Sequence, residues 1–238
     1  MRGLLQENLA ETANAYMAWW RLAGVDCAIG EEPTNWLRPV QEPPRTRIAA
    51  PDDAPAQAKP QSFDSFLTWL AEDAAQPERR WPGAALMPAG PVNAPLMVIT
   101  DMPDPADIGA GALLSERAGQ LFDAMLRTIG LKRQDIHLGS LFLSRPPGAM
   151  VEASDLAAAA ARMRTHVMLA SPRRLLLLGD RTIRTLLPTP ETGLRNFNHD
   201  GGTLPAFATF HPRLLLGQPA AKAECWRVLQ GLIEEMTE

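Results

Sequence analysis

The chain has 238 residues, of which 46% are hydrophobic, and a formal net charge of −4. This length and apolar content suit one α/β domain with an extension, or two small domains. The acidic balance argues against indiscriminate binding of nucleic acid, which needs a basic surface. The arginines that cluster between Arg162 and Arg184 form either a local basic face or an ordinary solvated helix surface.

Membrane, secretion and metal signals are missing from the sequence. No apolar run approaches the roughly 20 residues that a membrane helix needs, and the first residues contain no apolar stretch followed by a small-residue cleavage site. Cys27 and Cys225 lie far apart, and two thiols neither hold a four-thiolate iron–sulfur cluster nor match a zinc site. We therefore expect a cytoplasmic protein with free thiols, no membrane attachment, no metal and no cofactor.

Residues 1–61 differ in composition from the rest of the chain. Apolar side chains recur every three or four residues from Leu4 to Trp20, which is typical of one face of a helix that docks on the main domain or on a partner. Residues 30–61 contain seven prolines, which predict an extended or disordered linker. We therefore expect an N-terminal helix and Pro-rich linker over residues 1–61, available to a protein partner, and a folded domain over residues 62–238.

From Ser62 onward the pattern alternates between helices and strands. Ser62 can cap the first helix, and Gly130 can close the second. The periodicity predicts helices over 63–75, 116–129, 152–169, 181–187 and 218–236. Short apolar runs predict strands over 96–100, 135–143, 173–178 and 206–210, with a loop over 188–205 that contains a tight turn at 199–202. Such alternation predicts an α/β fold with three layers, α/β/α, around a central four-stranded parallel sheet.

In a parallel sheet the functional loops follow the carboxyl ends of the strands. Here these loops begin after Thr100, Leu143, Leu178 and Phe210. None of them contains a G-x-G-x-x-G or phosphate-loop motif, so we expect neither a dinucleotide site nor a nucleoside triphosphate site.

Four segments carry a resemblance to a known family. The first is Thr100–Phe122, which reads TDMPDPADIGAGALLSERAGQLF, and the second is Ser140–Pro147, which reads SLFLSRPP. The third is the apolar run Leu175–Gly179, and the last is His211–Gly217, which reads HPRLLLG. In order and spacing these segments resemble motifs of the uracil-DNA glycosylase superfamily, most closely the branch that carries an iron–sulfur cluster. The resemblance extends over residues 62–238 and implies the fold of that superfamily.

The resemblance also implies an activity and its residues. A DNA glycosylase flips a nucleotide out of the duplex, holds its base in a pocket and breaks the bond between base and sugar. At the matching catalytic positions, Asp101 would orient water and stabilise the sugar cation, and His211 would donate a hydrogen bond to the departing base. The other matching positions predict substrate binding by Met102, Pro103, Leu114 and Ser140, and DNA binding by Arg145, Arg213, Leu214 and Leu215.

Each of these residues also has an ordinary structural interpretation, and several family residues are replaced. Asp101 can cap a loop, His211 can bond a backbone carbonyl, and residues 214–216 can pack on the core. Leu114 stands where the family has an aromatic ring that stacks on the base, and Ser140 stands where it has an asparagine that reads the uracil edge.

The cysteines that hold the cluster in the iron–sulfur branch have no counterpart here. Ser144 stands at one of these positions, and residues 72–78 lack the cysteine pair of the others. We therefore expect that this chain binds no iron–sulfur cluster.

Two functions follow, and the sequence leaves both open. The first is an active DNA glycosylase for uracil or another deaminated base, which Asp101 and His211 support. The second is a glycosylase fold without catalysis that serves as a binding or partner module, which Leu114, Ser140 and the N-terminal helix support. A small-molecule hydrolase has no supporting motif, since Ser140 and Ser144 lie outside any G-x-S-x-G context.

Overall fold

The computed structural model describes Tyr16 and residues 60–237, except residues 188–192 and 200. The predictions for the N-terminal helix and the Pro-rich linker therefore lie outside the described residues, apart from Tyr16, which is helical and exposed. The helices and strands described below all belong to one unit of the chain, Ala58–Glu238.

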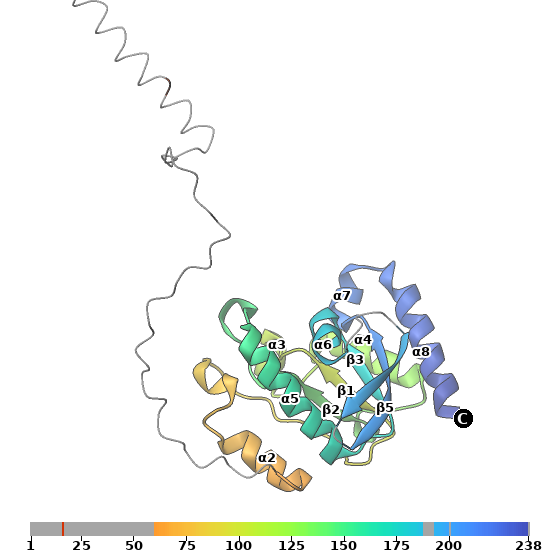
Figure 1. Ribbon diagram of the computed structural model, residues 1–238. Coiled ribbons are helices and arrows are strands. Elements are labelled where there is room, and N and C mark those ends of the chain that lie inside the picture. The colour runs from red at the N-terminus through yellow and green to blue at the C-terminus, as the bar shows by residue number, and fades with distance from the viewer. Residues whose placement is uncertain (1–15, 17–59, 188–192, 200, 238) are drawn as a thin grey trace, which may run out of the picture. The chain divides into compact units, whose positions relative to one another are not determined.

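A five-stranded sheet forms the centre of this unit, in the order β2-β1-β3-β5-β4 (Figure 1). The strands are β1 (Met97–Thr100), β2 (His137–Ser140), β3 (Leu175–Leu178), β4 (Gly193–His199) and β5 (Gly202–Thr209). Strands β2, β1, β3 and β5 run parallel, whereas β4 pairs antiparallel with β5 at one edge. The predicted α/β class and the parallel arrangement of four strands are confirmed.

The predicted loop over residues 188–205 is wrong in part, because it contains β4 and the start of β5. His199 and Gly202 face each other across the end of this hairpin, in the segment where a tight turn was expected. Of the side chains that the structure describes in β4, only Phe197 is buried. Such a polar edge strand lacks the apolar run that marks the buried parallel strands.

Helices cover both faces of the sheet. They are α2 (Phe63–Glu72), α3 (Pro105–Ala110), α4 (Glu116–Thr128), α5 (Ala153–Ala170), α6 (Asp180–Leu186), α7 (Pro212–Gly217) and α8 (Ala221–Thr237), with short 3₁₀ turns η1 (Pro77–Arg80), η2 (Arg133–Asp135) and η3 (Pro147–Ala149). Ser62 caps α2 as predicted, because its hydroxyl accepts a hydrogen bond of 3.2 Å from the amide of Ser65. Helices α3 and α7 lie where loops were expected, since six-residue helices show little periodicity.

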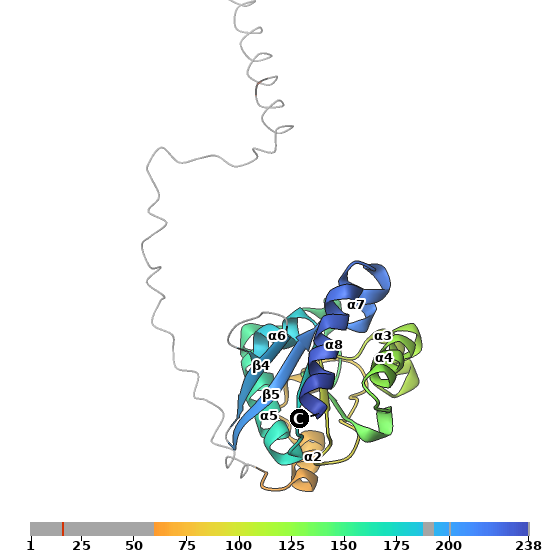
Figure 2. The ribbon, with the colours of Figure 1, turned by 90° about the vertical axis from the view of Figure 1, so that its right-hand side faces the viewer.

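The two faces of the sheet carry separate hydrophobic clusters. Met97 and Ile99 of β1 pack in the cluster that α5 and α6 cover, whereas Val98 packs in the cluster that α4 and α8 cover. This alternation follows from the two-residue period of a strand. In Figure 2, α5 and α6 accordingly lie on one side of the sheet and α4 on the other. The three-layer arrangement is therefore confirmed.

A buried ion pair and its hydrogen bonds connect the segment before β1 to α5 and to the loop after β2. The Glu78 carboxylate accepts hydrogen bonds from the Arg162 guanidinium at 2.6 Å and from the Leu143 amide at 2.8 Å, and Arg162 also donates to the carbonyl of Leu141. Burial alone would raise the pKa of Glu78, but Arg162 and the amide together hold that pKa below its ordinary value. The network thus fixes the backbone just before Arg145.

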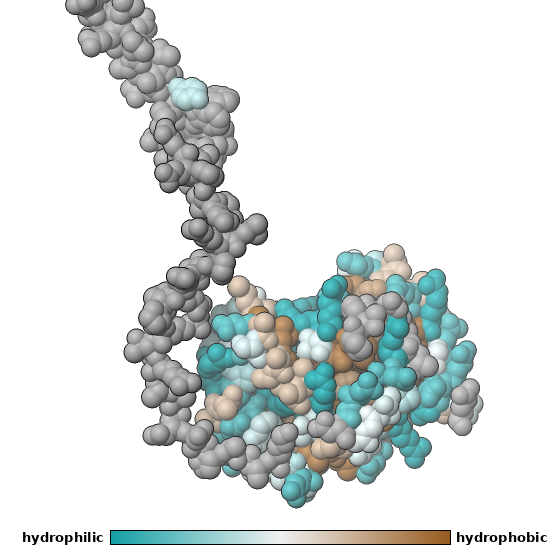
Figure 3. All heavy atoms as spheres, in the orientation of Figure 1, coloured by the Kyte–Doolittle hydropathy of each residue, from teal (hydrophilic) through white to brown (hydrophobic). Residues whose placement is uncertain are grey.

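Polar side chains, teal in Figure 3, cover much of the visible face, with apolar atoms between them. Among the described residues, no helix is long and apolar enough to span a membrane.

Candidate active site

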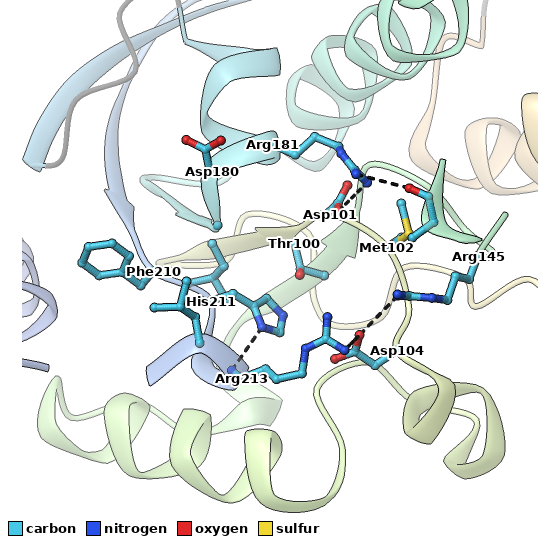
Figure 4. A pocket seen from close by; sticks show the side chains of 14 residues that line it. Thr100, Asp101, Met102, Asp104, Arg145, Asp180, Arg181, Phe210, His211 and Arg213 are labelled. Carbon is cyan, nitrogen blue, oxygen red and sulfur yellow. Dashed lines mark hydrogen bonds and ion pairs between the residues drawn. The ribbon is translucent and has the colours of Figure 1, made fainter. Parts of the chain in front are cut away.

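A cavity of about 600 Å³ opens beyond the carboxyl ends of the parallel strands (Figure 4). This is the place where an open α/β sheet binds its ligands, and the volume suits a small organic molecule or a nucleotide. The residues that line the cavity come from the loops after β1, β2, β3 and β5: Thr100, Asp101, Met102, Asp104, Arg145, Ala149, Leu178, Gly179, Asp180, Arg181, Phe210, His211, Arg213 and Leu214.

Asp101 follows β1 directly, and its two carboxylate oxygens differ in their surroundings. Oδ2 accepts a hydrogen bond of 2.8 Å from the Arg181 guanidinium. Oδ1 is buried and has no hydrogen-bond partner within the described part of the chain. Burial raises the pKa of Asp101, and the guanidinium of Arg181 partly offsets this effect. One oxygen is therefore held by Arg181, and the other is buried without a partner.

His211 follows β5 and stands at the N-terminus of α7, with its ring directed into the cavity in Figure 4. Its Nδ1 accepts a hydrogen bond of 3.2 Å from the amide of Arg213. In the neutral ring the proton must therefore sit on Nε2, which becomes a donor. Burial lowers the pKa of His211, so the ring is neutral near neutral pH. The imidazole can thus donate a hydrogen bond without first binding a second proton.

Asp104 connects the two predicted DNA-binding arginines. Its Oδ1 lies 2.6 Å from Nη1 of Arg213 and 3.3 Å from Nη1 of Arg145. Arg145 also donates to the carbonyl of Pro103 at 3.3 Å. Three loops, after β1, β2 and β5, are joined in this way at the edge of the cavity (Figure 4). Arg213 keeps 58% of its side chain exposed, so it remains accessible to an anion.

Met102 and Leu214 complete the predicted residues that line the cavity. Met102 is buried and contributes apolar surface beside Asp101, whereas Leu214 is 39% exposed in α7. Pro103 is buried next to them and lies outside the lining, where its carbonyl binds Arg145. The structure thus brings together Asp101 and His211 with an apolar wall.

Besides Pro103, three more predicted site residues do not line the cavity. Leu114 is 1% exposed and packs in the cluster under α4 and α8, because its apolar side chain gains more from burial there. Ser140 is buried as well, and its hydroxyl donates to the carbonyl of Phe142 at 2.7 Å. Leu215 is 2% exposed and packs in the same cluster as Leu114. In this conformation none of the three can contact a base or a duplex.

The prediction missed Arg181, Asp104, Thr100 and Phe210 as parts of the lining. Thr100 ends β1, and its buried hydroxyl has no hydrogen-bond partner among the described residues. A signal was present for Arg181, since it lies three residues after the end of β3, in a segment expected to be functional. Its pairing with Asp101, 80 positions earlier, is a tertiary contact that no local pattern reveals.

The described residues contain no group of three or more histidine, cysteine or carboxylate side chains that could hold a metal ion. Cys225 is a buried free thiol, and the hydroxyl of Ser144 is buried as well.

Comparison with known proteins identifies the family. No match is found among curated proteins. A sequence model described as the uracil DNA glycosylase superfamily matches residues 87–230, which is more than half of the chain and includes all the residues that line the cavity. The chain therefore belongs to the uracil DNA glycosylase superfamily.

Proposed function

We propose that this protein is a DNA glycosylase that flips a uracil or another deaminated base out of DNA and hydrolyses its N-glycosidic bond. The observation that carries the proposal is the shared cavity, which is lined by the Asp101 carboxylate and by the ring of His211, whose Nε2 can donate a hydrogen bond. Membership of the superfamily supports glycosylase-like chemistry in general.

The two residues suit the two charges that develop in this reaction. As the bond between the sugar C1′ and the base nitrogen breaks, the electron pair leaves with the base, and the sugar becomes cationic. The Asp101 carboxylate stabilises that cation and orients the water whose oxygen bonds to C1′. The Nε2–H of His211 binds the base oxygen on which negative charge develops. The proton of the attacking water passes to Asp101 or to solvent, and the charges balance.

Charged and apolar groups at the edge of the cavity suit DNA. We assign phosphate contacts to Arg145 and Arg213, because guanidinium groups bind phosphate oxygens in a bidentate manner. We assign to the half-exposed Leu214 the role of a wedge that enters the space left by the flipped nucleotide. We do not assign this role to Leu215, because its side chain is buried.

The lining suggests a broad choice of base. Among the described residues that line the cavity there is no asparagine or glutamine, so no side-chain amide can donate and accept in one plane. The neutral hydroxyl in this lining belongs to Thr100, and a single hydroxyl cannot provide the paired donor and acceptor of an amide. We therefore expect a smaller difference in excision rate between uracil and other deaminated bases than in an enzyme whose asparagine binds the uracil edge. We also propose that the chain is a relative of the iron–sulfur branch without a cluster, with Ser144 at a cysteine position.

A binding module without catalysis is the alternative, and one observation favours it. Two carboxylates that line the cavity are already engaged by arginines, Asp101 by Arg181 and Asp104 by Arg145 and Arg213. In that case residues 1–61 would recruit a protein partner to DNA.

The test is single-turnover excision from an oligonucleotide that contains one uracil, with the parent, His211→Ala and His199→Ala proteins. His199 lies in the β4–β5 hairpin and does not line the cavity, so it is a matched control. We expect excision by the parent and the control, and loss of about 10²–10³-fold in His211→Ala. A second expectation concerns pH. Because burial lowers the pKa of His211, the neutral ring is already the active form near neutral pH. The excision rate of the parent should therefore stay level up to about pH 8, whereas a catalyst that needs the imidazolium would slow over this range.

No excision by the parent at high enzyme excess, for uracil and for other deaminated bases, would exclude the enzyme and favour the binding module.

A further inference from the structure

We propose that Arg181 is a positioning residue for Asp101: it holds one carboxylate oxygen and so fixes the orientation in which this carboxylate acts on the reacting sugar. The inference rests on the proposed glycosylase function and names a residue that sequence motifs do not point to.

Arg181 is itself held in two directions. It lies in the first turn of α6, after β3, and its Nη1 donates to Oδ2 of Asp101 at 2.8 Å. Its Nη2 donates to the carbonyl of Ala149 at 3.3 Å, in the segment after β2. Because the guanidinium is planar, these two bonds fix its orientation. The loops after β1, β2 and β3 are therefore joined around Asp101 (Figure 4).

The second oxygen of Asp101 is the independent sign of a ligand. A buried carboxylate oxygen without a hydrogen bond is costly, and native structures place such groups where a substrate or water completes them. Oδ1 is such an atom, and Asp101 lines the cavity. Because Arg181 binds Oδ2, a rotation of the Asp101 carboxylate that exchanged its two oxygens would break the ion pair. Arg181 thus fixes the orientation of the carboxylate beside the cavity.

The charges around Asp101 give Arg181 a second effect. The groups that face this carboxylate are Arg181 from α6, Arg145 from the loop after β2, and Asp104 from its own loop. Burial and Asp104 raise the pKa of Asp101, and the two arginines lower it, Arg181 most strongly. Removal of Arg181 would therefore raise this pKa further, and Asp101 would lose its charge at a higher pH.

The experiment compares the parent with Arg181→Gln, Arg181→Lys and Arg184→Gln. Arg184 lies one turn further along α6, pairs with Asp180 and does not line the cavity, so it is the control. Single-turnover excision of uracil at saturating enzyme is measured from pH 5 to 9. In Arg181→Gln we expect the midpoint on the acid side of the pH–rate profile to rise by about one pH unit, so that the excision rate below this midpoint falls about tenfold. At high pH the excision rate should recover in part. Arg181→Lys should lie between this variant and the parent.

A second readout does not depend on activity. The carboxyl carbon resonance of Asp101, assigned by Asp101→Asn, is titrated by NMR in the parent and in the Arg181 variants. An upward shift of the midpoint in Arg181→Gln supports the proposal even where the parent excises no uracil, which separates its failure from that of the proposed function.

Three results would overturn the proposal. One is an unchanged Asp101 midpoint in both Arg181 variants. Another is a rate loss of equal size at every pH, which indicates a merely structural role. The third is weaker DNA binding with an unchanged pH profile, which makes Arg181 a phosphate contact. If Arg181→Gln does not fold, the Asp101 midpoint and the pH profile of Arg181→Lys provide the test.

Discussion

Asp104 holds two arginines that come from different loops. A carboxylate between two guanidinium groups neutralises part of the charge that DNA phosphates would otherwise meet. Because both arginines pair with Asp104, this carboxylate competes with a phosphate for their guanidinium groups. At the scale of single residues, we therefore expect Asp104 to lower the DNA affinity that we propose for the two arginines.

We predict that Asp104→Asn binds duplex DNA more tightly than the parent. Asparagine keeps the size of the side chain and can still cap α3, while the charge is removed. The affinity at about 0.1 M salt should rise several-fold, and the slope of log K against log salt should steepen by about one, as for one additional phosphate contact. Fluorescence anisotropy over a salt series measures both, with Asp123→Asn, whose partner is Arg133 away from the cavity, as the control. Weaker binding would mean that Asp104 pre-organises the arginines instead.

At the scale of elements, α7 places one leucine at the cavity and its neighbour in the core. Leu214 lines the cavity and is half-exposed, whereas its neighbour Leu215 packs under α4 and α8. Neighbours on a helix point about 100° apart, so the same apolar triplet serves both the site and the core. The sequence run Leu214–Leu216 alone does not reveal which leucine faces which side.

Alanine substitutions should separate these two tasks. We expect Leu215→Ala to lower the free energy of unfolding by about 2–5 kcal/mol, because it leaves a cavity in the core. Leu214→Ala should change stability by less than about 1 kcal/mol and should slow excision, because the wedge is shortened. Urea unfolding and single-turnover excision measure the two effects. Equal stability losses, or an unchanged excision rate in Leu214→Ala, would contradict this assignment of roles.

The elements that the sequence predicted and those that it missed differ in a physical way. Buried parallel strands such as Leu175–Leu178 carry continuous apolar runs, and α4 carries a clear helical period, so both are visible locally. The edge strand β4 is half-exposed and polar, and α3 has only six residues. These elements are stabilised by pairing and capping with distant or neighbouring groups rather than by an apolar pattern.

The site follows the same rule. Asp101 and His211 were predicted because they follow two strands within recognisable motifs, and the parallel sheet brings the ends of those strands to one cavity. Leu114 and Ser140 match motif positions too, yet packing against their neighbours removes both from the lining. The ion pair between Arg181 and Asp101 depends on the fold as a whole, so its discovery required the structure.

At the scale of the whole molecule, the sheet, its covering helices and the cavity are parts of one unit, Ala58–Glu238. The buried side chains of the three hydrophobic clusters that the structure describes lie between Phe66 and Leu232. The family match, over residues 87–230, falls inside the same limits. A domain that contains its own core should fold without the rest of the chain.

We therefore predict that a protein that begins at Ala58 folds and keeps the chemistry of the full chain. Its thermal midpoint should lie within about 4 °C of that of the full chain, since a loss of 1 kcal/mol shifts the midpoint by about that amount in a domain of this size. Single-turnover excision under saturating enzyme should be unchanged, because the residues that line the cavity all lie after position 58. Calorimetry and excision on both proteins provide the comparison. A markedly lower midpoint would show that residues 1–57 contribute to the folded core, whereas an unchanged midpoint with reduced excision would show that they contribute to DNA binding or catalysis.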